Sequence, residues 1–61
     1  MQEKILSVRG HTPRIADDAF IASTAVVIGD VEIGSRASIW YHCVVRGDIH
    51  QIRIGEGTNI Q

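Results

Sequence analysis

A chain of 61 residues has room for one domain at most, and a globule of this size has a marginal apolar core. Six Lys and Arg against seven Asp and Glu give a net charge of −1, so the sequence lacks the basic surface that nucleic-acid binding requires. No apolar run is long enough for a signal peptide or a membrane span, and the single cysteine, Cys43, provides no disulfide framework. We therefore expect a cytoplasmic protein with no nucleic-acid partner and no membrane partner.

The first segment, residues 1–19, does not share the spacing that follows it. Apolar residues within 5–8 have the character of a short strand, and a turn at 10–13 ends it. We expect this segment to be a lead-in strand and a cap over the first exposed backbone of the structure behind it. Asp17 and Asp18 are expected to form a solvated corner without a chemical role.

From residue 20 the sequence repeats every six residues. A branched apolar residue opens each unit and a second apolar residue follows four places later, at Ile21, Ala25, Val27, Val31, Ile33, Ala37, Ile39, Cys43, Val45 and Ile49. A sustained period of six is typical of a hexapeptide solenoid, in which a unit buries its apolar side only by stacking on the next. The sequence therefore predicts an all-β parallel β-helix with these ten side chains pointing inward.

Two other folds fit this spacing less well. A helix is disfavoured by the many β-branched residues and by Gly29, Gly34 and Gly47. A meander of hairpins with turns at those glycines is the better alternative. It would leave only the three residues 31–33 between the first two turns, fewer than the usual strand of about five or six.

The repeat is interrupted after Val45. The next unit begins at Ile54, nine residues on instead of six, so segment 48–53 carries about three extra residues and is predicted to bulge as a loop. Insertions in solenoids collect on one face, which is often the binding face. We expect residues 20–61 to form the coils, with the repeat continuing beyond residue 61.

Three strings in this region resemble the N-terminal part of the γ-class carbonic anhydrases, in particular their bacterial relatives: Ser38–Asp48, Ile54–Gly55 and Asn59–Gln61. The resemblance extends from about residue 10 to residue 61. It implies a left-handed parallel β-helix with triangular coils, a homotrimer, and reversible hydration of carbon dioxide to bicarbonate at the subunit interfaces. It also implies zinc held by three histidines beyond residue 61, so no residue of this chain is expected to be a metal ligand.

The same resemblance assigns roles to four polar residues. Gln61 matches the catalytic glutamine that hydrogen-bonds the metal-bound water or hydroxide. Arg46 and Asp48 match an ion pair at the subunit interface beside the substrate, where a guanidinium holds a carboxylate and a bicarbonate in the same fork geometry. Asn59 is expected to support this region. Without the resemblance, Arg46 and Asp48 would be a solvated pair worth under about 1 kcal/mol, and Asn59 a corner residue.

The remaining candidates are aromatic residues and histidines. Trp40 and Tyr41 are adjacent aromatics on a repeat of small side chains, so we expect a covered surface there, which is the subunit interface. The three histidines lack the close spacing of a zinc motif, so we expect isolated surface residues at His11, His42 and His50.

Two alternative functions stay open. A hexapeptide-repeat acyltransferase that uses acyl-CoA shares the solenoid but does not require the Arg-Gly-Asp and Asn-Ile-Gln strings. A trimeric scaffold without catalysis fits one departure from the archetypal family members, which carry acidic residues after the aspartate to shuttle protons. This chain has Ile49 at that point and no carboxylate in 49–53, so His50 replaces the shuttle or activity is weak or absent.

Residues 1–61 alone are expected to be inactive, to bind zinc without a defined stoichiometry and to unfold without a cooperative transition. Ordering the repeats costs more conformational entropy than the burial of ten small apolar side chains returns, so they need neighbours. Circular dichroism melting and a zinc titration of the isolated peptide check this. A sharp melting transition would show the energetic argument to be wrong.

Overall fold

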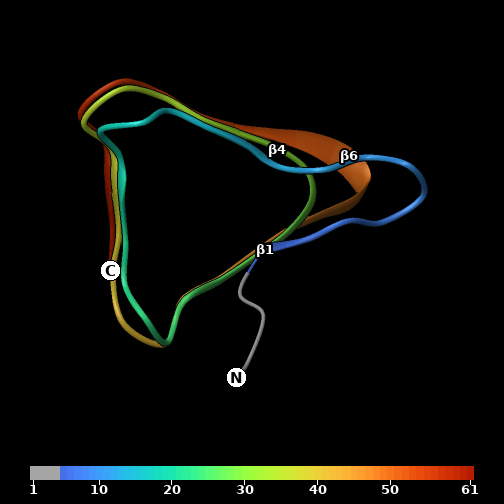
Figure 1. Ribbon diagram of the computed structural model, residues 1–61, viewed down its shortest axis with the longest axis horizontal. Coiled ribbons are helices and arrows are strands. Elements are labelled where there is room, and N and C mark those ends of the chain that lie inside the picture. Colours follow the sequence, from blue (N-terminus) through green and yellow to red (C-terminus); the bar gives the residue numbers. More distant parts are fainter. Residues whose placement is uncertain (1–4) are drawn as a thin grey trace.

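A computed structural model describes residues 5–61, so residues 1–4 of the predicted lead-in segment lie outside the described residues. Strands supply the regular structure of this part of the chain: β1 (Ile5–Leu6), β2 (Arg14–Ile15), β3 (Phe20–Ile21), β4 (Val26–Ile33), β5 (Ser38–Ile39), β6 (Val44–Ile54) and β7 (Asn59–Ile60). Figure 1 shows the chain winding repeatedly around a triangle. Within residues 5–61 there is no helix with the length and apolar character needed to cross a membrane.

Successive coils lie on one another in parallel register. Ile21 pairs with Ile39 and Val27 with Val45, and both offsets are 18 residues (39 − 21 and 45 − 27), which is three units of six per coil. Strands β3, β5 and β7 form one side of the triangle, while β4 and β6 bend around a vertex to form the other two (Figure 1). The chain turns counter-clockwise as it recedes in this view, which is the left-handed sense. The predicted left-handed parallel β-helix is confirmed.

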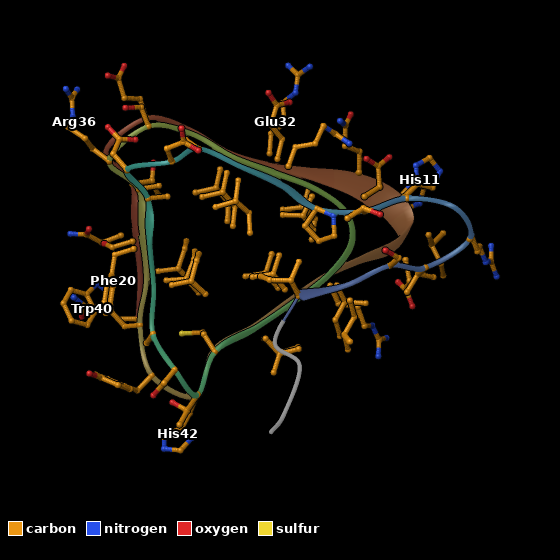
Figure 2. The ribbon with its side chains drawn as sticks, viewed as in Figure 1. His11, Phe20, Glu32, Arg36, Trp40 and His42 are labelled. Carbon is orange, nitrogen blue, oxygen red and sulfur yellow. The ribbon has the colours of Figure 1, made fainter. Side chains whose placement is uncertain are left out.

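Apolar side chains fill the interior of the triangle. Seven of the ten positions predicted to point inward are buried: Ala25, Val27, Val31, Ile33, Ala37, Ile39 and Val45. Ile21 and Cys43 are half-buried and pack against the same cluster. In Figure 2 the labelled charged side chains point away from this interior. Up to Val45, the positions that the period of six predicted to point inward are therefore buried or half-buried.

Ile49 is the exception, because its side chain is 76% exposed. Gly29 pairs with Gly47, but the next pair along the strands is Val31 with Ile52, so β6 has three more residues than β4 at this point (52 − 47 is five, 31 − 29 is two). Ile52 is half-buried and occupies the place that Val31 has one coil earlier. The prediction that Ile49 points inward is wrong, because the six-residue spacing does not continue through the extra residues.

The lead-in segment lies along the edge of β4 that β6 leaves free. β1 pairs in parallel with the first half of β4 and β2 with the second half. Between them, residues 7–12 leave the triangle as the blue loop of Figure 1, closed by backbone hydrogen bonds between Val8 and His11 of 2.9 Å each. These strands add a first layer to the stack. The division of the chain into a cap of residues 1–19 and coils of residues 20–61 stays a prediction.

Asp18 holds one corner of the triangle, although the sequence suggested no role for it. Its carboxylate accepts a hydrogen bond from the Ser35 hydroxyl at 2.7 Å and another from the backbone N–H of Arg36 at 3.2 Å, one coil further on. Arg36 turns this corner with φ of +60°, a left-handed conformation. The bond from Ser35, and then the one from Arg36, lowers the pKa of the Asp18 carboxyl group because both favour the charged form.

We expect Asp18→Ala to lower the melting temperature of the intact protein at neutral pH and to have little effect in acid. The pKa is lower in the folded state, so the hydrogen bonds stabilise the fold above the unfolded-state pKa, and this stabilisation is lost as the pH falls through the folded-state pKa. Thermal melts over a pH series measure the difference. Asp17→Ala is the matched control. Identical pH profiles for the two variants would show that the hydrogen bonds from Ser35 and Arg36 to Asp18 do not stabilise the fold.

Candidate functional site

Arg46 and Asp48 lie together on the outer side of β6. The Nε atom of Arg46 is 3.2 Å from the Oδ2 atom of Asp48, which makes an ion pair. Residues two apart in a strand point to the same side, so their pairing follows from local geometry. The side chains are 65% and 36% exposed, and the guanidinium is therefore accessible to a further ligand.

Gly47, between these two residues, sits where successive coils touch at the backbone. A Cβ atom on Gly47 would lie 2.5 Å from the carbonyl oxygen of Asp30, and one on Gly29 would lie 2.6 Å from the carbonyl oxygen of Gly47. Real Cβ atoms do not approach other atoms so closely, so a side chain here would push the coils apart. Gly47 thereby allows the close contact between coils at the vertex where Arg46 and Asp48 lie.

The same vertex carries a second aspartate one coil earlier. Asp30 precedes Asp48 by 18 residues, the length of one coil. The Nη2 atom of Arg14 lies 3.2 Å from its Oδ1 atom, and the Nδ1 atom of His11 lies 3.9 Å from its Oδ2 atom. Figure 2 shows His11 pointing outward at this end of the molecule. The vertex therefore presents two carboxylates, each paired with an arginine.

Asn59 lies on a different side of the triangle, in β7. It is in register with Ser38 of β5, whose hydroxyl donates a hydrogen bond to the Oδ1 atom of Asn59. The Nε1–H group of Trp40 donates to the same Ser38 oxygen at 3.0 Å. Ser38 is buried, whereas Asn59 is exposed. Three polar side chains of two neighbouring coils are thus joined in one chain of hydrogen bonds.

Trp40 also belongs to an exposed aromatic patch of Phe20, Trp40 and Tyr41. The ring centroids of Phe20 and Trp40 are 4.9 Å apart, and those of Trp40 and Tyr41 are 6.3 Å apart. Figure 2 shows Phe20 and Trp40 together on the outside of the triangle. The sequence alone suggested no role for Phe20. The spacing of Phe20 and Trp40 could have indicated their contact, because they are 20 residues apart in the sequence. A separation of 18 residues leads to the next coil, and two further residues lead to the next side chain on the same side of the strand.

Gln61 follows β7 and is exposed. The pairing of β5 with β7 places it beside Trp40, on the side of the triangle that carries Asn59. Arg46 and Asp48 lie on β6, which belongs to the other sheet. The structure therefore brings the predicted site residues into two groups on different sides of one chain.

Residues 5–61 hold no group of three His, Cys, Asp or Glu side chains that is suitable for a metal ion. His42 lies at a corner with φ of +62°, where its N–H group donates to the Thr24 hydroxyl at 3.0 Å. His11 lies beside Asp30 on the opposite part of the fold. The described residues therefore do not fit a zinc site on their own.

Comparison with known proteins adds four similarities. A family model described as bacterial transferase hexapeptide (six repeats) matches residues 12–47. Gamma carbonic anhydrase 2, mitochondrial, of Arabidopsis thaliana is 51% identical over 57 residues, 93% of this chain and 20% of that protein. Carbonic anhydrase of Geobacillus kaustophilus is 47% identical over 57 residues, 93% of this chain and 31% of that protein. A crystal structure of a hexapeptide transferase family protein from Anaplasma phagocytophilum has a TM-score of 0.95 and 52% identity, covering 100% of this chain and 37% of that one.

These similarities concern only part of each relative. The chain spans about a fifth of the Arabidopsis protein and about a third of the Geobacillus protein. Both names refer to carbonic anhydrases, while the solved structure is named for the hexapeptide transferase family.

We expect Gly47→Ala to lower the free energy of unfolding of the whole protein by about 2 kcal/mol, because the new methyl group meets the Asp30 carbonyl oxygen. Gly55→Ala is the matched control. Its Cβ would meet only the Thr58 hydroxyl at 3.7 Å, an ordinary contact, so the cost should stay under about 0.5 kcal/mol. Chemical unfolding at one protein concentration compares the variants, and equal costs would rule out the close approach of the coils.

Proposed function

Because the chain belongs to the bacterial transferase hexapeptide family and is 47% to 51% identical to carbonic anhydrases over 93% of its length, we propose that its whole protein hydrates carbon dioxide reversibly to bicarbonate. The observation that carries this proposal is the exposed Arg46–Asp48 ion pair on the glycine vertex. Such a pair presents an oriented guanidinium to a small planar anion. Composition supports a cytoplasmic protein, since Cys43 is a free thiol.

Arg46 is proposed to hold the bicarbonate. Its Nε atom is engaged by Asp48, which leaves the terminal nitrogens to form two parallel hydrogen bonds to a bicarbonate or carboxylate group. A lysine ammonium has the same charge but cannot reproduce this fork. Asp48 keeps the guanidinium in one orientation. We propose that an adjacent subunit also contacts Arg46 and Asp48 at this vertex.

Gln61 is proposed to orient the oxygen that attacks carbon dioxide. A neutral amide can both donate and accept a hydrogen bond, so it can hold a water or hydroxide without neutralising it. Gln61 and Asn59 lie on a different side of the triangle from Arg46, which supports a site that takes these residues from two copies. We propose a homotrimer because the resemblance to the γ-class carbonic anhydrases implies one, with Trp40 and Tyr41 covered by the neighbouring subunit.

Zinc is proposed for the whole protein, with its ligands supplied by residues other than those described, since residues 5–61 hold no suitable group. When bound, such an ion makes water nucleophilic near neutral pH. The contribution of this chain is confined to orienting water through Gln61 and holding the anion through Arg46.

Two alternatives are retained, each for a specific observation. The matching family and the superposed structure are named for transferases, which supports an acyltransferase that uses acyl-CoA. Segment 49–53 contains no carboxylate, which supports a trimeric scaffold without catalysis. The carbonic anhydrase proposal has the advantage that it gives Arg46, Asp48 and Gln61 a common purpose.

The proposal is tested by stopped-flow hydration of carbon dioxide and metal analysis on the whole protein. We expect Arg46→Lys and Gln61→Ala each to reduce kcat/KM by about tenfold or more. Arg53→Lys is the matched control, because Arg53 lies on the same strand and pairs with Glu32 at 3.4 Å, away from the proposed site. Acyl transfer without metal would favour the acyltransferase, and the absence of both activities would favour the scaffold.

A further inference from the structure

The hydrogen bonds around Ser38 have a fixed direction. An indole N–H group can only donate, so Trp40 must donate to the Ser38 oxygen, at 3.0 Å. The Ser38 hydroxyl keeps its own hydrogen, which it donates to the Oδ1 atom of Asn59. The Ser38 hydroxyl thus accepts from Trp40 and donates to Asn59 at the same time, as a group with one hydrogen and two lone pairs can do.

This direction determines which end of the Asn59 amide is available. With Oδ1 occupied by Ser38, the Nδ2 group with its two hydrogens faces away from Ser38 on an exposed residue. The alternative amide orientation would bring Nδ2 against the Ser38 hydroxyl and present an oxygen to the outside. An exposed oxygen would repel an anion, whereas an exposed NH₂ group attracts one.

We infer that Ser38 is a positioning residue that, with the indole of Trp40, holds Asn59 as a hydrogen-bond donor to bicarbonate. The inference rests on the proposed function for the anion at Asn59, and on the observed hydrogen bonds for the orientation of the amide. Ser38 is suited to the role because it is buried, with 9% of its surface exposed, and lies between Phe20 and Asn59 in the register of β3, β5 and β7. Its hydroxyl is therefore held by the stack.

Four variants of the whole protein separate positioning from packing. Ser38→Ala removes the hydroxyl, and Ser38→Thr keeps it on a residue that suits a strand. Trp40→Phe keeps an aromatic ring against Phe20 but removes the donor. Ser35→Ala is the control, since it removes a hydroxyl that bonds Asp18 at another corner. Melting temperatures are recorded for all four.

The direct measurement is the Asn59 side-chain NH₂ signal in NMR spectra of protein labelled with ¹⁵N-asparagine, titrated with sodium bicarbonate at constant pH and ionic strength. Asn59→Asp assigns the signal by its disappearance. We expect bicarbonate to shift the wild-type signal, with affinity reduced about tenfold in Ser38→Ala and about threefold in Trp40→Phe, and preserved in Ser38→Thr and Ser35→Ala. In the dehydration assay, KM for bicarbonate should rise by the same factors while KM for carbon dioxide, which is uncharged, stays unchanged.

The outcomes distinguish this inference from the proposed function. A protein without hydratase activity whose Asn59 signal still responds as described would overturn the proposed function and support the positioning role. An active protein in which Ser38→Ala leaves the bicarbonate affinity unchanged would overturn the positioning role alone. A signal that responds to chloride as strongly as to bicarbonate would also overturn it.

Discussion

The hydrogen bonds between the backbones of successive coils are the constraint on which this structure depends. The backbone N–H group of Phe20 donates to the carbonyl oxygen of Ala37 at 2.9 Å, and the backbone N–H group of Ser38 donates to that of Thr58 at 2.8 Å. Neighbouring coils thus satisfy each other's backbone polar groups. The ladder holds only if each coil follows the path of its predecessor. Extra residues must therefore leave the stack, and those in β6 do so at the vertex after Gly47. The interior stays regular while the outside carries the variation.

The same ladder arranges the outer side chains in columns, and this links the fold to the proposed chemistry. Phe20, Ser38 and Asn59 occupy one column on three coils, which allows a hydroxyl to reach the amide of the next coil. Asp30 and Asp48 recur at one vertex with the close backbone contact at Gly47 between them. A solenoid therefore builds polar sites from residues about 18 apart.

Much of this arrangement was predictable. The period of six identified the inner positions through Val45, and the similarity to carbonic anhydrases confirms the resemblance seen in the strings around Arg46 and Asn59. The place of Ile49 was not predictable from the period alone, because a repeat gives no rule for which residues leave the stack at an insertion. The role of Asp18 was also missed, since its partners Ser35 and Arg36 lie on the next coil.

By itself the sequence determined the kind of fold, because apolar residues at every sixth position can be buried together only in a stacked prism. It also determined that Arg46 and Asp48 share one side of a strand, which is a local property of extended backbone. Only the tertiary structure decided which residues of different coils meet: Trp40 with Phe20, Asn59 with Ser38, and Asp18 with Ser35. The reason is physical. The register of the coils is set by backbone hydrogen bonds along the whole stack, and an insertion changes the sequence separation of the pairs that span it, from 18 for Phe20 and Ser38 (38 − 20) to 21 for Ser38 and Asn59 (59 − 38).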